Sequence, residues 1–369
     1  MKIAKIELSH HAIDLDPPFP ASWDPVPRRR FVVDLVRVTT DDGLVGVGSG
    51  DPMPGLIGNE HLFIGQDPRD LARHARIIDN LSFFYGRIWP LDLALWDLFG
   101  KITGQPVWRL LGGSSGRIPC YASSGTLRDP KAMAAQAERF AELGYKHMKV
   151  RFHEADWRQD IHKIQAIRAA IGDRMELMVD CNQGWRMPWD ASPSWTLKDA
   201  LAVTRALEPL GVFWLEEPLH RSDLQGMRIL RESTSIRIAG GELARDLESM
   251  RAWLREGCVD VLQTDVVCGG GITGLADLFR EARAMGVAFT PHTWGNGIGL
   301  LANAHLVAGL GPMLPLEFPY DPPEWTTARR DHGLVAPIEV DAQACLNLDE
   351  SPGLGIHLDE ERLAATRIG

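Results

Sequence analysis

Short apolar segments that end in a polar residue recur along the second half of the chain, separated by stretches long enough for a helix. Six of these polar residues are Lys149, Asp180, Glu216, Glu242, Asp265 and His292. Strands that alternate with helices form a parallel sheet. In a barrel of such units, the carboxyl ends of the strands meet on one face, where catalytic groups lie. We therefore expect these six side chains to share one pocket.

The whole second part of the chain follows this rhythm. Strands are predicted at 118–122, 146–151, 176–180, 212–216, 237–242, 260–265, 287–292 and 313–317. Helix-length segments fit between them, several ending at a glycine, which commonly terminates helices. The sequence therefore predicts an α/β fold with eight parallel strands in a TIM-type barrel.

The first part of the chain is patterned differently. Strands are predicted at 2–8, 31–38 and 44–48, and helices at 68–80 and 90–103. The last two strands are joined by a short turn, so they pair antiparallel. The proline-rich stretch 16–30 is predicted to be a loop, and a loop of this length in a compact domain is usually functional or disordered.

These patterns divide the chain of 369 residues into three parts. We expect an N-terminal α+β domain over 1–117 and a barrel over 118–335. Residues 336–369 are expected to pack back on the N-terminal domain. A barrel of about 250 residues with a smaller domain accounts for the length.

Composition excludes several classes of protein. With 39 basic and 49 acidic residues, the chain lacks the basic excess that non-specific nucleic-acid binding requires. The five cysteines are scattered and odd in number, which is typical of reduced thiols in a cytoplasmic protein. No signal peptide or membrane-spanning segment is predicted. The expected partner is a small molecule, with no nucleic acid and no membrane.

Three carboxylates end consecutive strands, namely Asp180, Glu216 and Glu242. Converging acids would repel one another in a partly buried site unless a cation joined them. Ligands that offer only oxygen favour Mg²⁺, with Mn²⁺ as an alternative, over zinc. Any one of these acids would equally serve as a helix cap or a loop ion pair. Three in succession favour the metal site.

Cations and a histidine accompany these acids. Lys149 and Arg151 are two residues apart on one strand, so both face the same side, where they suit a substrate carboxylate or a developing enolate. Asp265 and His292 end neighbouring strands, and a carboxylate beside an imidazole makes a general base. Without its neighbours, His292 would be interpreted as a helix cap. Glu317 could bind a substrate oxygen or form a structural ion pair.

Two glycine-rich stretches, 268–271 and 295–299, each precede a predicted helix. A helix N-terminus after glycines can bind phosphate. Neither stretch has the P-loop pattern or lies in a Rossmann unit. Tight turns between strand and helix account for both, and a phosphate-binding or aldolase-like barrel remains a lesser alternative.

Six longer motifs occur along the chain. They are Leu-Ala-Leu-Trp-Asp-Leu-Phe-Gly-Lys at 93–101, Pro-Val-Trp-Arg-Leu-Leu-Gly-Gly at 106–113, Val-Asp-Cys-Asn-Gln-Gly-Trp at 179–185, Trp-Leu-Glu-Glu-Pro at 214–218, Gly-Gly-Glu at 240–242 and Pro-Gly-Leu-Gly-Ile at 352–356. Together they resemble the mandelate racemase group of the enolase superfamily. The resemblance implies an N-terminal capping domain, completed by the C-terminal tail, over a modified (β/α)₇β barrel. It also implies lid loops at 16–30 and 50–58, and a dimer or octamer.

The resemblance also implies roles for individual residues. Mg²⁺ would be bound by Asp180, Glu216 and Glu242. Lys149, Asp265, His292 and Glu317 match positions that supply bases or stabilise the enolate, and we assign Asn182 to substrate binding. Family chemistry removes the proton α to a carboxylate, and the enolate is stabilised by Mg²⁺ and neighbouring cations.

Arg151 departs from the family pattern, in which a second lysine acts as a base on this strand. Arginine stays protonated and is a good oxyanion clamp but a poor base. One base, His292, then remains. We therefore expect β-elimination of water from a sugar acid, aldonate or aldarate, to give a 2-keto-3-deoxy acid.

Other functions remain open at this stage. A racemase, an epimerase or a lactone cycloisomerase would use the same enolate, and finding a second functional base, either Lys149 or Arg151, would favour this alternative. A non-catalytic protein on an enzyme scaffold is a further alternative. Failure to bind Mg²⁺ would support it.

Overall fold

The computed structural model describes residues 1–368. Its N-terminal part holds a three-stranded antiparallel sheet in the order β1-β2-β3, followed by two long helices and a short one. The elements are β1 (Ile3–Phe19), β2 (Arg28–Thr40), β3 (Val45–Gly50), α1 (Leu71–Tyr85), α2 (Pro90–Thr103) and the short α3 (Val107–Leu110). α2 has Pro90 at its start and Gly104 in a left-handed conformation at its end, which are the residues that favour a helix start and stop.

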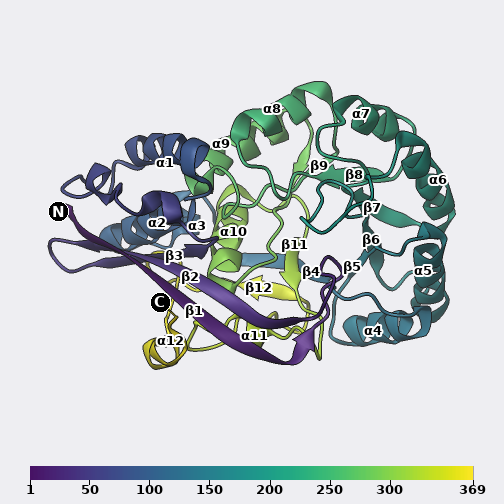
Figure 1. The fold of residues 1–369 in the computed structure, drawn as a ribbon, viewed down its shortest axis with the longest axis horizontal. Helices are drawn as coiled ribbons and strands as arrows, with labels where there is room; N and C mark the ends of the chain where they lie inside the picture. The colour runs from purple at the N-terminus through teal and green to yellow at the C-terminus, as the bar shows by residue number, and fades with distance from the viewer. Residues whose placement is uncertain (369) are drawn as a thin grey trace.

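The long proline-rich loop expected at 16–30 is largely absent, so that prediction was wrong. β1 continues to Phe19 and β2 begins at Arg28, which leaves residues 20–27 as the connection. β1 is an edge strand, where prolines are tolerated because one side of the backbone needs no partner. The two strands form a long ribbon that crosses from the capping domain to the barrel (Figure 1).

The barrel contains eight parallel strands in the hydrogen-bonded order β10-β9-β8-β7-β6-β5-β4-β11. They are β4 (Arg117–Ser123), β5 (His147–Arg151), β6 (Glu176–Asp180), β7 (Val212–Glu216), β8 (Arg237–Gly240), β9 (Val261–Leu262), β10 (Ala288–Phe289) and β11 (Leu316–Pro319). Side-chain contacts bring β10 and β11 together, since Thr290 Oγ1 donates to the Pro315 carbonyl at 2.8 Å and the backbone N–H of Thr293 to Glu317 at 2.7 Å.

Seven helices connect these strands and surround them (Figure 1). They are α4 (Pro130–Glu142), α5 (Trp157–Ile171), α6 (Leu197–Leu207), α7 (Leu224–Glu232), α8 (Leu247–Glu256), α9 (Gly271–Ala284) and α10 (Gly297–Leu310). Seven strand–helix units followed by a last strand make a (β/α)₇β barrel, as predicted. None of the helices within residues 1–368 is long and apolar enough to cross a membrane.

Three strands end earlier than predicted. β8 stops at Gly240, β9 at Leu262 and β10 at Phe289, so Glu242, Asp265 and His292 lie in the loops that follow. Gly241 has a φ of +108° and turns the chain directly after β8. In contrast, β11 starts late and continues past Glu317, which lies inside the strand.

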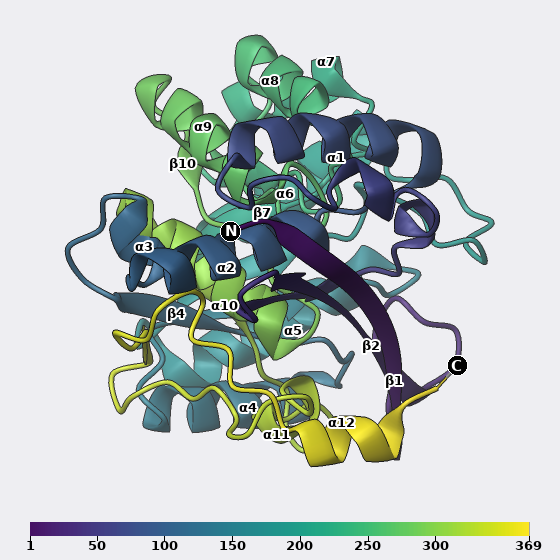
Figure 2. The ribbon, with the colours of Figure 1, turned by 90° about the vertical axis from the view of Figure 1, so that its left-hand side faces the viewer.

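The C-terminal segment contacts both domains. β12 (Cys345–Asn347) pairs antiparallel with β4 of the barrel, whereas α12 (Glu360–Thr366) lies beside β1 (Figure 2). The buried Asp97 on α2 joins the parts, because its carboxylate accepts from the backbone N–H groups of Val47 at 2.9 Å and Leu354 at 2.8 Å. The motifs at 93–101 and 352–356 therefore meet, and they build the fold. The boundaries predicted at 117 and 335 stay predictions.

Large side chains fill the barrel interior below the predicted site. Tyr121, Met178, Trp214 and Val261 form a buried cluster inside the ring of strands. The ammonium of Lys149 lies 5.7 Å from the centroid of the Tyr121 ring. The interior is therefore a solid base on which the polar residues at the strand ends rest.

Candidate active site at the carboxyl ends of the barrel strands

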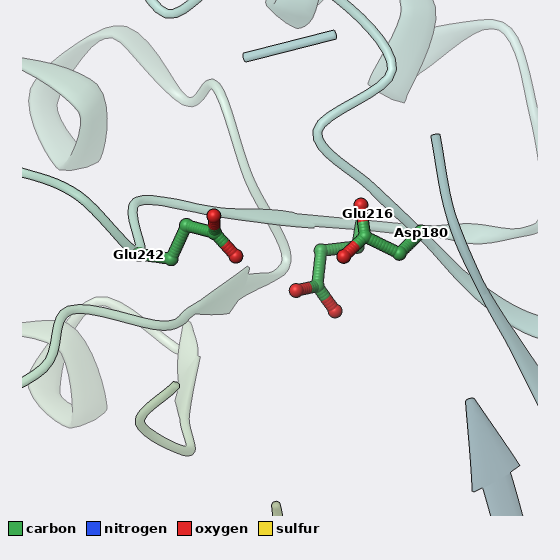
Figure 3. Close-up of side chains that lie close together, drawn as sticks. All are labelled: Asp180, Glu216 and Glu242. Carbon is green, nitrogen blue, oxygen red and sulfur yellow. The ribbon is translucent and has the colours of Figure 1, made fainter. Parts of the chain in front are cut away.

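Asp180, Glu216 and Glu242 form a buried carboxylate cluster, with one oxygen of each within 4.8 Å of the others. Figure 3 shows the three carboxylates facing one another. Burial raises the pKa of Glu216 to about 8; the positive charge of Lys149 opposes this shift and the negative charge of Asp180 adds to it. Such an arrangement favours a bound cation, which would remove the repulsion.

The donor set fits a hard divalent cation. All three side chains offer oxygen, which is the ligand type that Mg²⁺ and Mn²⁺ take up. Glu242 Oε2 is buried and has no hydrogen-bond partner within residues 1–368. Its other oxygen accepts from the indole N–H of Trp185 at 2.6 Å. One oxygen is therefore held in place while the other is left over for a ligand.

Lys149 is completely buried among the acids. Its ammonium lies 2.7 Å from Glu216 Oε1, 2.6 Å from Glu317 Oε1 and 3.7 Å from Asp180 Oδ2. Burial lowers the pKa of Lys149, but the charges of Glu216 and Glu317 outweigh burial and raise it above its ordinary value. The side chain is therefore a fixed positive charge in this arrangement.

Arg151 lies beside Lys149 and is held on several sides. Its Nη1 pairs with Asp180 and its Nε donates to the Ser124 carbonyl at 3.0 Å. The guanidinium carbon is 5.1 Å from the ring centroid of Trp23 and 5.6 Å from that of Trp294, so the group lies against both indoles. Burial lowers the pKa of Arg151, whereas the charge of Asp180 raises it, with a net increase. The guanidinium stays charged.

His292 and Asp265 form the predicted pair. His292 Nδ1 is 3.1 Å from Asp265 Oδ2, and Asp265 Oδ1 accepts from the side chain of Asn303 at 2.8 Å. Burial lowers the pKa of His292, but the charge of Glu242 and the bond to Asp265 raise it to about 9. A cation on Glu242 would cancel part of this attraction, so that more of the imidazole would be neutral near pH 7 and able to accept a proton.

Glu317 and Asn182 support their neighbours. Glu317 accepts from Ser123 Oγ at 2.7 Å, and despite its burial the charge of Lys149 helps to lower its pKa to about 2. Asn182 has a left-handed backbone with a φ of 50°, and its amide donates to the Phe152 carbonyl at 3.1 Å. Its side-chain oxygen faces Arg151 at 3.3 Å. Asn182 is therefore engaged by the protein in this structure.

The nine predicted residues thus lie in one site, and their assigned roles stay predictions. Two residues that were not predicted also contact the acids. Gln263 donates to Glu216 Oε2 at 2.9 Å, and Trp185 contacts Glu242. Gln263 is two residues before Asp265, and residues two apart in an extended strand face the same side. This rule could have placed Gln263 in the site. No spacing rule points to Trp185, which reaches the site from a loop.

A cavity of about 220 Å³ opens next to these groups. Arg151, Glu242 and His292 line its inner end, and its outer wall is aromatic: Phe19, Trp23, Phe31, Trp185, Trp294 and Trp325. Trp189 does not line this cavity. It is about half exposed (47%), and its indole N–H donates to the Trp23 carbonyl at 3.1 Å.

The glycine-rich stretches contact the protein itself. At the start of α9, a side chain on Gly271 would meet Asp92 Oδ2 at 2.4 Å, and the backbone N–H of Thr273 donates to this carboxylate at 3.1 Å. At the start of α10, the side chain of Asn296 accepts from the N–H of Ile298 at 3.1 Å. Protein oxygens therefore occupy both helix N-termini, where a phosphate would bind.

Comparison with known proteins agrees with this architecture. Residues 132–362 match the family described as enolase C-terminal domain-like, and residues 3–112 match the N-terminal domain of mandelate racemase and muconate lactonizing enzyme. The chain belongs to the mandelate racemase and muconate lactonizing enzyme family. Membership in this family, which is part of the enolase superfamily, supports the interpretation that the protein is an enzyme.

Relatives in the family carry out more than one reaction. The 3,6-anhydro-α-L-galactonate cycloisomerase of Streptomyces coelicolor is 31% identical over 92% of both chains. The arabinonate dehydratase of Saccharolobus solfataricus is 30% identical over 72% of this chain and 68% of its own. The crystal structure of the 3,6-anhydro-D-galactonate cycloisomerase of Zobellia galactanivorans matches with a TM-score of 0.84 and 29% identity, covering 100% of both chains. Dehydratases and cycloisomerases are thus both among the relatives.

Proposed function

We propose that this protein is a Mg²⁺-dependent lyase that removes the proton α to the carboxylate of a sugar acid and then eliminates the β-hydroxyl as water. The observation that carries the proposal is that only one of the three basic side chains in the site, His292, can lose its proton near neutral pH and act as a base. His292 can give and take a proton, whereas the guanidinium of Arg151 stays protonated and the ammonium of Lys149 lies 2.6 Å from Glu317, an acid outside the metal cluster. A site with one base favours elimination over inversion at the α-carbon.

Asp180, Glu216 and Glu242 would hold the metal. When bound, Mg²⁺ would supply Lewis-acid polarisation of the substrate carboxylate. Mn²⁺ is the alternative ion.

The residues of the chain divide the remaining work. His292 takes the α-proton at Nε2, while Asp265 accepts the hydrogen on Nδ1 and fixes the tautomer. Lys149 and Arg151 stabilise the negative charge of the enediolate, in a buried site where such interactions are strong. The Cβ–O bond then breaks, His292 returns the proton to the leaving hydroxyl, and the enol product tautomerises to a 2-keto-3-deoxy acid.

A cycloisomerase is the second candidate, supported by the aromatic wall of the cavity and by the relative that is 31% identical. The first half of the reaction is unchanged. If the oxygen on the β-carbon is part of a ring, the same Cβ–O cleavage opens the ring and the protonated oxygen stays in the product. Substrate and product are then isomers, and no water is released. An epimerase would need a second base.

Proton NMR in D₂O tests the proposal. Purified protein with Mg²⁺ is given a panel of aldonic, aldaric and anhydro-sugar acids. Conversion of one acid to a 2-keto-3-deoxy product is the expected result. Mass spectrometry then distinguishes loss of water, which lowers the mass of the product, from isomerisation, which leaves it equal to that of the substrate. Deuterium at the α-carbon with no elimination would support the epimerase instead. No exchange with any acid, in a sample shown to bind Mg²⁺, would contradict enolate chemistry.

A further inference from the structure

The outer wall of the cavity is a continuous layer of aromatic rings. Trp23, in the β1–β2 connection, lies 5.2 Å between ring centroids from Trp294, which follows β10. Phe19 stacks on Trp294 at 5.8 Å and contacts Trp325 at 5.0 Å. Phe31 on β2 contacts Trp325 edge-on, also at 5.0 Å between ring centroids. The tip of the ribbon in Figure 1 and the barrel loops build this wall together.

The wall offers few groups that could bind a polar substrate. Among the residues that line the cavity, the charged side chains are Arg151, Glu242 and His292 at the inner end, together with Arg28. Arg28 is already paired with Asp24, through Nε and through Nη2 at 3.2 Å from Oδ1. Asp24 neutralises its charge, so a second carboxylate on the substrate would find no unpaired cation in the wall that the structure describes.

These features restrict the acid that fits. Among the wall residues, the indole N–H of Trp325 is buried and has no partner within residues 1–368. It could serve one hydroxyl, but the several hydroxyls of an open-chain sugar acid would mostly lose their water against the rings without gaining a partner, which is unfavourable. A ring presents a flat face of C–H groups, and such a face packs well on indole. A compact ring also fits a cavity of about 220 Å³.

We propose that the substrate is a monocarboxylic acid whose carbon chain is closed into a ring, and that the ring lies against Trp23 and Trp294. This inference rests on the first half of the proposed function, the removal of the α-proton, because the inner end of the cavity must hold the carboxylate and the α-carbon. Where the ring oxygen is bonded to the β-carbon there is no β-hydroxyl to lose, and the second half is then the ring opening of the second candidate. It adds that open-chain aldonates and aldarates are poor substrates.

A matched set of six-carbon 2-hydroxy acids tests this inference. A 3,6-anhydrohexonate, the corresponding hexonate and the corresponding hexarate are each incubated with the Mg²⁺-loaded protein in D₂O, and α-proton loss is followed by NMR. We expect kcat/KM to be at least about ten times higher for the anhydro acid. An equal or higher value for the hexonate or the hexarate would overturn the ring preference and leave the proposed function intact.

Binding measurements on a variant that lacks the proposed base test the ring preference independently of the reaction. The affinity of the three acids for the His292→Asn variant is measured by calorimetry with Mg²⁺ present. We expect the anhydro acid to bind at least about ten times more tightly than the hexonate. Tighter binding of the anhydro acid without any α-proton exchange in the wild type would support the inference and contradict the lyase. Equal binding of all three would overturn the inference.

Variants of the wall give a second measure. The measure is kcat/KM for the anhydro acid divided by kcat/KM for the hexonate. Trp23→Leu should lower this ratio at least about fivefold, chiefly by raising KM for the anhydro acid. Trp23→Phe keeps a ring and should restore most of the ratio. Phe84→Leu, at an exposed aromatic of α1 that is outside the cavity, is the control and should leave the ratio unchanged. An unchanged ratio in Trp23→Leu would overturn the inference.

Discussion

At the scale of single residues, the guanidinium of Arg151 occupies the centre of the site. Asp180 and the Ser124 carbonyl accept its hydrogens, and two indoles lie within 5.6 Å of its carbon. A planar fork with fixed donors suits such a position, because it presents several N–H groups at once and packs on aromatic rings. The residue thus links the carboxylate cluster to the aromatic wall.

Arg151→Lys tests this arrangement. Lysine keeps the positive charge but lacks the several fixed N–H donors and the planar surface of the guanidinium. We therefore expect kcat/KM to fall about 10- to 100-fold. The ratio comes from steady-state kinetics on the best acid of the panel. Retention of wild-type kcat/KM would contradict a guanidinium-specific role. Appearance of acid inverted at the α-carbon would show that a base at 151 reaches the opposite face of the substrate.

His292→Asn tests the proton transfer. We expect turnover and α-deuterium exchange to be abolished, with a loss of at least about 10²–10⁴, since general-base catalysis contributes that much. Mg²⁺ affinity, measured by calorimetry, should stay nearly intact because His292 is not one of the three metal ligands. Substantial residual exchange in this variant would refute His292 as the base.

The carboxylate cluster should make stability depend on Mg²⁺. A ligand that binds only the folded state at about 100 times its Kd adds about 2.7 kcal/mol to the free energy of unfolding. We expect Mg²⁺ to raise the melting temperature of the wild type and of Asp173→Asn, a change at an exposed acid. Asp180→Asn should abolish the increase. The same increase in all three proteins would contradict the assigned site.

At the scale of elements, much of the fold could be predicted because strand and helix periods differ. α2, β6 and β7 have the predicted bounds. The ends of β9 and β10 were predicted less well. Each strand has only two paired residues, and the loop that follows it is also buried, so the sequence pattern does not mark where the strand stops. The aromatic wall was largely missed, because Phe19, Phe31 and Trp325 are brought together by tertiary contacts that no spacing encodes.

Helix α10 carries a pH-sensitive contact that can be tested. His305 is buried, and its Nδ1 accepts from the backbone N–H of Trp108 at 3.1 Å. Burial lowers the pKa of His305 to about 4. Between pH 6.5 and 4 the unfolded chain therefore binds a proton that the folded state does not, so acid lowers the free energy of unfolding. The contribution is about 3 kcal/mol at most.

His305→Gln removes the titration and keeps an oxygen that can accept from Trp108. Urea unfolding at pH 4.5 and at pH 7.5 measures the free energy of unfolding for both proteins. We expect the wild type to lose more stability than the variant over this range. An equal loss in the two proteins would mean that His305 is protonated in the folded state as readily as in the unfolded chain.

At the scale of the whole molecule, the capping domain is fixed to the barrel through buried carboxylates. Asp97 binds the C-terminal segment, and Asp92 on α2 binds the first turn of α9, where Thr273 Oγ1 donates to it at 2.7 Å. The indole of Trp96 donates to the same hydroxyl at 2.8 Å. The ribbon that carries Trp23 belongs to this docked domain, so its position over the site depends on these contacts.

Thr273→Val removes the shared hydroxyl and leaves Asp92 and the indole of Trp96 each without one partner. An unsatisfied buried group costs about 1–3 kcal/mol, so we expect the free energy of unfolding to fall by that amount in urea titrations. Thr273→Ser should retain most of the stability. Thr103→Val, which alters an exposed threonine of the same domain, should stay within about 0.5 kcal/mol of the wild type. If Thr273→Val were as stable as Thr103→Val, the Asp92 contact would not hold the two domains together.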